Sequence, residues 1–422
     1  MRNNFNSYIN SVGAKVIFFE FFLSSFVAWF AIEVIPSSYT PPLKYVGMSA
    51  PLFIQIVLTF LVMLAFGSLL HSMRSSVLSV LLELLGKLRI KPAYVILGFS
   101  LFAVSFFASD LSRGRYIGSA SENMQGTFIA LAVLFAKTYF GMLAFVELVT
   151  EKRVLEKYQW IIVFICMVLT IDGMAHIMLV GLLLLHVFFF RVFSDANNIT
   201  LKALFLLFLG LLCFLLYSIG MAWKSSSDDI YTAFSGGLES TLHNIYWLIY
   251  RLSSVFLSMC IVAKESFENL SFFYYGWDIT YKEVGYRACK VFAGGACEAY
   301  IHEYQSIGRY NFAMISHVDP GRGGASPGVL GSAMYLSPWL FSGAVAGFYY
   351  CLVARLINVS LQYTQSIKKM TLFKLVSTVY LIRDFFLNPA SLMDPFSGPF
   401  ISLVAILLAF SYYFQKTRSL GH

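Results

Sequence analysis

The sequence predicts an all-α protein, a polytopic integral membrane bundle with about ten transmembrane helices and one large outer loop. Three observations predict this fold class. Hydrophobic residues make up 58% of the 422 residues and charged residues only 12%, about half the charge of a water-soluble domain. The apolar residues gather in runs long enough to cross about 30 Å of hydrocarbon. The only long region between such runs is 223–332.

The expected spans follow one another along the whole chain, so we expect a single transmembrane domain, 1–422. They cover residues 16–35, 51–70, 93–110, 127–149, 159–172, 174–192, 203–222, 333–354, 372–388 and 398–415. As one helix, residues 159–192 would be about 50 Å long, too long for a single crossing. We therefore expect two short spans that meet at Asp172 and Gly173.

The distribution of basic residues predicts the orientation of the spans. With the N-terminus in the cytoplasm, seventeen Lys and Arg residues fall at cytoplasmic ends, whereas the short outer loops hold only Lys44, Arg113 and Arg115. Cytoplasmic loops carry the excess of positive charge in membrane proteins. This asymmetry predicts that the large loop, 223–332, lies outside.

Two further apolar stretches are expected as amphipathic helices rather than spans. If Asn244–Lys264 crossed the membrane, the basic residues at 355–374 would face outward and Arg251 would lie in lipid, at a cost of several kcal/mol. We expect this stretch on the outer side, on the bundle or the membrane surface. Residues 75–91 are expected as a second amphipathic piece on the cytoplasmic side.

Composition also narrows the classes of function. The net charge of +8 sits mostly in short loops, where it indicates orientation rather than nucleic-acid binding. The six Cys are scattered without metal-ligand spacing, so no metal and no cofactor is expected. Residues 1–14 are polar and the first apolar run is long, so no cleavable signal peptide is expected.

The residues suited to chemistry gather in the predicted outer loops. Arg113 and Arg115 stand where a span leaves the membrane, and a guanidinium offers fork-shaped donors to phosphate oxygens. Alternatively, Arg113 and Arg115 are ordinary loop residues that contact lipid phosphate. Residues 302–331 then collect two histidines, two carboxylates and two arginines in one segment.

Several short motifs together resemble the O-antigen polymerase family, the Wzy-type oligosaccharide repeat-unit polymerases. Arg115 is followed by ten residues and Gly126, and YRLSS at 250–254 puts an arginine at the start of an outer helix. The segment ASPGVLGSAMYLSPWLFSGAVAGFYY at 325–350 is similar to the family's entry into the next span. Arg309-Tyr310 matches a second arginine-bearing loop approximately, because Gly321 comes one residue late. Ser332-Ala333 stands where many members carry Gly-Glu.

This resemblance implies a membrane glycosyltransferase of the bacterial inner membrane, multi-pass, with its active face in the periplasm. Such enzymes polymerise undecaprenyl-diphosphate-linked repeat units into O-antigen-type polysaccharide, as a step of lipopolysaccharide biosynthesis. The implied partners are the lipid-linked glycan donor and acceptor, membrane lipids and a chain-length regulator protein; no nucleic acid is implied. Because the Glu that many members carry is missing here, its work would fall to another carboxylate.

The chemistry of the reaction suggests roles for the polar residues. Negative charge builds up on the leaving diphosphate, and fixed guanidinium groups stabilise it. The candidates for diphosphate binding are Arg113, Arg115, Arg251, Arg287 and Arg322. Arg309 is placed with the catalytic residues.

A group that takes the proton of the acceptor hydroxyl is also needed, and a carboxylate or neutral imidazole suits this role. The choices are His302, Glu303, His317 and Asp319. Each has an alternative as an ordinary loop residue; Asp319-Pro320-Gly321, for example, is a turn signature.

Other polar residues are expected to be structural. Lys137, inside a span, either reaches toward the membrane surface or pairs with a carboxylate, and Arg383-Asp384 could satisfy each other within the bundle. Asp172 and His176 are expected to satisfy the turn between the two short spans, although buried ionisable groups in membranes are often functional. Cys289 and Cys297 are eight residues apart in a loop where disulfides are permitted, and either pair or stay free.

Two other functions remain open. An O-antigen ligase shares the scaffold, but ligases usually carry a His-Asn pair that residues 328–335 lack. A transporter or flippase of lipid-linked sugars would be expected to show inverted repeats across many spans, and none is evident.

Overall fold

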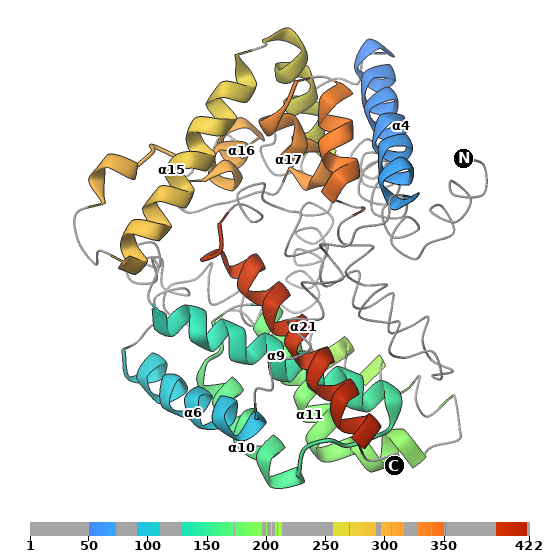
Figure 1. Cartoon of the computed structure of the whole chain (residues 1–422), viewed down its shortest axis with the longest axis vertical. Coiled ribbons are helices and arrows are strands. Elements are labelled where there is room, and N and C mark those ends of the chain that lie inside the picture. Colours follow the sequence, from blue (N-terminus) through green and yellow to red (C-terminus); the bar gives the residue numbers. More distant parts are fainter. Residues whose placement is uncertain are drawn as a thin grey trace, which may run out of the picture. The chain divides into compact units, whose positions relative to one another are not determined.

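The computed structural model describes residues 50–72, 91–109, 128–172, 174–195, 256–269, 271–292, 297–304, 306–315, 327–338, 340–349 and 394–419, with Cys351 and single positions between 200 and 212. All regular secondary structure within these ranges is helical, so the all-α prediction is confirmed for the described part of the chain. The chain divides into two compact units, and Figure 1 labels their longer helices together with α16 and α17.

Unit 2 comprises residues 80–244, 363–373 and 401–422. Its helices are α6 (Pro92–Ala108), α9 (Phe128–Thr150), α10 (Lys157–Leu169), α11 (Met174–Asp195) and most of α21 (Gly398–Ser419). Helix α6 contacts α9 and α10, and α11 contacts the same two helices, so the four form a closed ring. Aromatic rings fill its centre: Phe140 lies 6.0 Å from Phe99 and 6.1 Å from Trp160, measured between ring centroids.

The helix ends in unit 2 follow local sequence rules. Helix α6 begins with Pro92, which is favoured in the first helical turn because its missing N–H would have no partner there. Helix α10 begins at a capping box in which Gln159 accepts a hydrogen bond from the Glu156 amide at 3.0 Å. These ends lie within two or three residues of the predicted ones.

Two pairs of contacts show the direction in which helices of unit 2 run. Lys137 of α9 contacts Asp172, two residues before α11 begins, and Glu147, ten residues further along α9, contacts His186 of α11. The numbering rises together on both helices, so α9 and α11 are parallel. Thr138 and Thr150 of α9 likewise contact Ser402 and Tyr413 of α21, so α21 is parallel to α9 as well.

Unit 1 comprises residues 1–79, 245–362 and 374–400. It holds α4 (Ala50–Ser72), a helix at 256–268, α15 (Phe272–Phe292), the short η3 (Glu298–Tyr300), α16 (Ile307–Ile315), α17 (Gly328–Leu336) and the helix Leu340–Tyr349. Helix α15 packs against η3, α16 and α17. Gly276 makes this packing close, since a Cβ there would lie 2.1 Å from the Tyr335 carbonyl oxygen.

Helix Leu340–Tyr349 packs against α4 through two glycines. A Cβ at Gly343 would lie 2.4 Å from the Thr59 carbonyl oxygen, and one at Gly347 would lie 2.6 Å from the Met63 carbonyl oxygen. Small residues four apart let membrane helices approach closely. From the first contact to the second, the residue number rises by four on both helices, from Gly343 to Gly347 and from Thr59 to Met63. The two helices are therefore parallel.

The predicted span at 333–354 is wrong in its start. Helix α17 begins at Gly328 and ends at Leu336, and a second helix begins at Leu340 after a bend. Proline explains the break, because the residue before a proline is forced out of the helical region. Ser337, which precedes Pro338, is extended with φ −156° and ψ 146°. All nine residues of α17 are buried.

The prediction of an amphipathic surface helix at 244–264 is wrong for its second half. Residues 256–263 are helical, and every one of them is buried. They pack against α16: Asn311 Nδ2 donates to Ser258 Oγ at 2.7 Å, and Ile261 packs with Ile315. Their apolar side chains therefore belong to the core of unit 1. Residues 244–255 lie outside the described ranges.

The helices differ in their ability to cross a membrane. Pro51–Leu70 and Phe128–Leu148 are long and apolar enough to do so, and the bent pair of α17 and Leu340–Tyr349 adds a third if it is one span. Helices α6 and α10 and parts of α11 and α21 are apolar but shorter. The expected spans 16–35 and 372–388, most of 203–222, and the amphipathic piece 75–91 lie outside the described ranges.

Candidate functional site

The outer-loop candidates that the structure describes lie, in unit 1, on α15, on the segment 297–304 and on α16. Cys289 of α15 and Cys297 form a disulfide with 5.9 Å between their Cα atoms, which decides between the two states that the sequence left open. Tyr300 of η3 lies against Gly285, where a Cβ would come within 2.3 Å of the Tyr300 ring. The disulfide and this contact hold residues 297–304 against α15, and thereby position His302 and Glu303.

His302 is buried and its two ring nitrogens face different groups. Nδ1 accepts a hydrogen bond from the Tyr304 amide at 3.2 Å, and Nε2 lies 3.7 Å from the Asp278 carboxylate. Burial lowers the pKa of His302 below its ordinary value; the charge of Lys282 lowers it further, and Asp278 and Glu303 oppose this. The imidazole is therefore neutral at pH 7.

Glu303, the next residue, has an exposed side chain. Its Oε1 accepts a hydrogen bond from the Tyr275 hydroxyl at 3.0 Å. Burial, followed by this hydrogen bond, raises the pKa of the Tyr275 phenol above its ordinary value, so the phenol stays protonated and remains a donor. The pair combines an accessible carboxylate with a fixed donor.

An aromatic cluster borders these polar groups. The ring of Tyr310 lies 5.0 Å from those of Tyr275 and Tyr304, and the Tyr275 ring lies 5.4 Å from that of His302. Burial raises the pKa of Tyr310 to about 12. Aromatic rings favour such offset and edge-to-face pairs, and the rings of Tyr275 and Tyr304 border the His302 imidazole.

Two predicted arginines lie within the described residues, in different surroundings. The Arg287 guanidinium contacts two carboxylates, Asp394 at 2.8 Å and Glu283 in the preceding turn of α15. Both carboxylates are buried, so the charge of Arg287 is compensated inside unit 1. Arg309 lies in the first turn of α16, where its amide donates to Ser306 Oγ at 3.2 Å, and its side chain is half-buried.

The remaining predicted site residues lie outside the described ranges. They are His317, Asp319, Arg113, Arg115, Arg251 and Arg322. The structure therefore brings together His302 and Glu303 with Tyr275 and Asp278, two α15 residues that the sequence analysis did not single out. The aromatic and acidic residues of 274–278 at helical spacing were the available signal.

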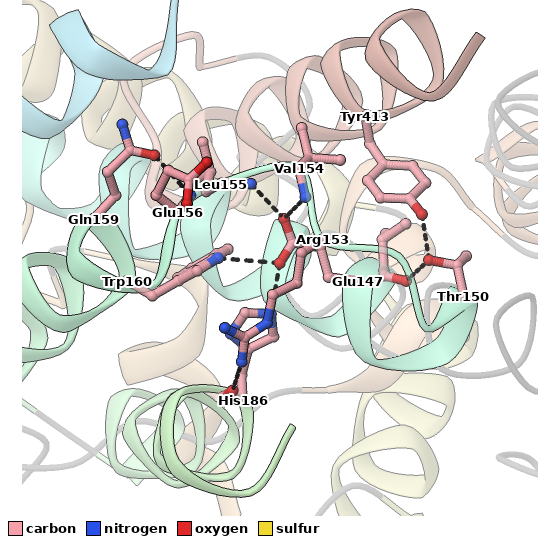
Figure 2. A network of polar contacts seen from close by, with 11 residues as sticks. Glu147, Thr150, Arg153, Val154, Leu155, Glu156, Gln159, Trp160, His186 and Tyr413 are labelled. Carbon is pink, nitrogen blue, oxygen red and sulfur yellow. Dashed lines mark hydrogen bonds and ion pairs between the residues drawn. The ribbon is translucent and has the colours of Figure 1, made fainter. Parts of the chain in front are cut away.

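A second polar cluster, in unit 2, surrounds Glu147 (Figure 2). Its Oε1 accepts hydrogen bonds from the Val154 and Leu155 amides at 2.7 and 3.1 Å. Its Oε2 accepts one from Trp160 Nε1 at 3.0 Å and lies 2.6 Å from His186 Nε2. Glu147 and His186 are fully buried. An acidic residue within an apolar run was the signal for this cluster, and the sequence analysis did not use it.

Arg153 closes the Glu147 cluster at the loop between α9 and α10. Its Nη2 donates to the His186 carbonyl at 3.1 Å, and its guanidinium lies 4.2 Å from the centre of the Phe190 ring. Burial lowers the pKa of Arg153, while the charge of Glu147 opposes this. Arg153 therefore serves the packing of unit 2.

A third cluster joins Lys137, Asp172 and His176. Lys137 Nζ donates to Asp172 Oδ1 at 3.1 Å and to the Thr170 carbonyl, and His176 Nδ1 contacts the same Asp172 oxygen. All three side chains are buried. Lys137 pairs with a carboxylate, one of its two expected states; Asp172 lies in the turn before α11, and His176 lies in the first turn of α11.

Within the ranges that the structure describes, no three His, Cys, Asp or Glu side chains gather as a metal site requires. No family model, no curated protein and no solved structure matches this chain. What is established is its class: a protein whose described part is all-helical, with apolar helices of membrane-spanning length.

Proposed function

We propose that this chain is an inner-membrane glycosyltransferase that polymerises undecaprenyl-diphosphate-linked repeat units at its periplasmic face. The observation that carries the proposal is the polar and aromatic group of unit 1, where an exposed carboxylate, Glu303, follows the buried His302 on a disulfide-braced segment. A disulfide is expected only in an oxidising compartment, which agrees with a periplasmic site.

The directions of the helices support about ten spans in the proposed order. A chain reverses direction at each crossing, so parallel helices are separated by an odd number of crossings. Helices α11 and α21 both run parallel to α9, as expected if 203–222, 333–354 and 372–388 cross between them. A further crossing at 244–264 would make α21 antiparallel to α11. The parallel pair of α4 and Leu340–Tyr349 fits the same order.

The proposed reaction needs positive charge on the leaving diphosphate and a proton acceptor at the sugar hydroxyl. Arg113, Arg115, Arg251 and Arg322 remain the proposed diphosphate ligands, and Arg309 remains among the proposed catalytic residues. Arg287 is a weaker candidate, because Glu283 and Asp394 already compensate its charge.

Deletion of the gene followed by gel analysis of surface polysaccharide tests the proposal. Single-repeat caps in place of long chains are expected for a lost polymerase. Retained lipid-linked chains without surface polymer would instead indicate a ligase, and loss of all surface repeats would indicate transport.

Arginine variants test the phosphate ligands. Losing a charged hydrogen bond in the transition state costs about 1.5–3 kcal/mol, or roughly ten- to a hundredfold in rate. Arg115→Ala, Arg251→Ala and Arg309→Ala should therefore reduce the amount of long-chain product. The corresponding Arg→Lys variants should restore it only in part, because lysine lacks the paired donors of arginine.

Lys152→Ala is the control, since Lys152 is an exposed residue of the α9–α10 loop. Arg153 is unsuitable as a control because it packs on Phe190. Unchanged chain length in all three variants would contradict the assignment.

Transport of lipid-linked sugars is a second candidate, favoured by the buried ionisable groups of unit 2. Ionisable side chains inside a membrane often form proton relays, and His186 Nδ1 has no hydrogen-bond partner among the described residues. The deletion experiment separates this candidate from polymerisation, because a lost transporter removes all surface repeats.

A further inference from the structure

The two nitrogens of His302 are both engaged in ways that oppose a role as proton acceptor. Nδ1 accepts the Tyr304 amide hydrogen, so the lone pair at Nδ1 is in use. In a neutral ring the proton then lies on Nε2, which faces Asp278 at 3.7 Å. This tautomer has no free lone pair with which to take a proton from a sugar hydroxyl.

Glu303, unlike His302, has an atom that can accept a proton from a substrate. One of its oxygens, Oε1, accepts the Tyr275 hydroxyl, and within the described ranges no donor contacts the other, Oε2. The side chain is exposed, so a substrate can reach Oε2. Asp278, the other nearby carboxylate, is paired with Lys282 at 2.9 Å.

We propose that Glu303, oriented by Tyr275, is the proton acceptor of the polymerisation, and that His302 is a positioning residue. The inference rests on the proposed function. The acceptor hydroxyl oxygen forms a bond to the anomeric carbon of the donor, and the bond from that carbon to the diphosphate oxygen breaks. The hydroxyl proton passes to Glu303 Oε2, and the electron pair of the broken bond leaves with undecaprenyl diphosphate.

The geometry explains why a phenol is placed beside the carboxylate. The Tyr275 hydroxyl donates to Oε1 at 3.0 Å and so restrains the orientation of the exposed Glu303 carboxylate. The ring of Tyr310 packs against that of Tyr275, and the ring of Tyr304 packs against Tyr310 in turn. A residue that acts through Glu303 should affect turnover more than substrate binding.

The test uses the purified full-length protein and lipid-linked repeat units extracted from a strain that lacks it. Release of undecaprenyl diphosphate and chain growth are followed together. Glu303→Gln keeps an acceptor for Tyr275 but removes the base, and should slow both about a hundredfold or more. Glu298→Gln is the matched control, an exposed carboxylate of η3 on the same segment, and should leave turnover unchanged.

Two further variants separate the roles of the neighbours. His302→Asn retains a side-chain acceptor for the Tyr304 amide, as in an Asx-turn, and should keep most of the activity. Tyr275→Phe should lower kcat by about tenfold, the effect of one hydrogen bond, with KM unchanged.

The outcomes are distinct. If Glu303→Gln turns over at the wild-type rate, the inference is overturned. If His302→Asn is inactive while Glu303→Gln is active, the inference is overturned as well, because His302 would then be the proton acceptor. Should Glu303→Gln fail to fold, Glu303→Asp retracts the charge by one methylene group; slow turnover at native stability then supports the inference, and wild-type turnover overturns it. If the wild-type protein itself releases no undecaprenyl diphosphate, the proposed function fails and the inference with it.

Discussion

Glu147 of unit 2 and Glu303 of unit 1 are carboxylates in opposite situations. Glu147 is fully buried, and its two oxygens contact the two loop amides, the Trp160 indole and the His186 imidazole. Glu303 is exposed and accepts one hydrogen bond, from Tyr275. Both stand beside a histidine, so residue type alone does not separate them.

The two carboxylates differ in whether an oxygen is left to accept a further hydrogen bond or a proton. A buried charge is tolerated only when it is paired and hydrogen-bonded, and Glu147 meets this condition by using both oxygens. Glu147 therefore stabilises the loop between α9 and α10, and neither of its oxygens is available to a substrate. Within the described ranges no donor contacts Oε2 of Glu303, and its side chain is exposed. We therefore expect variants in unit 2 to affect stability and variants around Glu303 to affect turnover.

The largest effect is expected from Glu147→Ala. The substitution leaves the Val154 and Leu155 amides, the indole and the imidazole without their acceptor in the core, and breaking a buried charged network costs roughly 3–5 kcal/mol. The unfolding midpoint of the purified protein in detergent measures this cost. Glu268→Ala, at an exposed carboxylate of unit 1, should leave the midpoint unchanged. Equal midpoints for the two variants would remove the contrast between Glu147 and exposed carboxylates.

Lys137→Met should have a somewhat smaller effect. It leaves Asp172 buried without its ammonium partner, at a cost of about 3 kcal/mol, the lower end of the range for such pairs because His176 stays beside the carboxylate. Adding Asp172→Asn should recover most of the loss, because the carboxylate left without its ammonium partner is then replaced by a neutral amide. A double variant less stable than Lys137→Met in the unfolding assay would show that the carboxylate is needed for another reason.

The smallest effect is expected from the protonation of His302. Its pKa is lower in the folded protein than in the unfolded chain, so below the ordinary value of about 6.5 the unfolded state binds the proton first. Stability should therefore fall as the pH drops from about 6.5 toward the folded pKa. The charged groups near the ring are Asp278, Lys282 and Glu303. His302→Asn should make the midpoint less dependent on pH in this window; parallel pH curves for the two proteins would contradict this assignment.

The sequence predicted the helices well because hydropathy is a local property. Helices α4, α6 and α9 begin and end within a few residues of the predicted bounds. Pro338 was also visible in the sequence as a signal for the break after α17, but the apolar run around it outweighed that signal. The disulfide between Cys289 and Cys297 could be anticipated as one of two states, since the two cysteines are only eight residues apart.

The roles of the polar side chains depended on distant partners. Arg287 is a weaker candidate phosphate ligand than the sequence suggested, because Asp394, 107 residues later, pairs with its guanidinium. The burial of residues 256–263 could not be predicted, because α16 covers them from later in the chain.

The sequence by itself therefore determined the helical class, the apolar runs and the position of the long polar segment between them. Only the tertiary structure decided which of those polar groups are already satisfied and which remain available. The physical reason is that hydrophobicity belongs to each residue and its near neighbours, whereas the state of a carboxylate or an imidazole depends on the donors and charges that the fold brings to it.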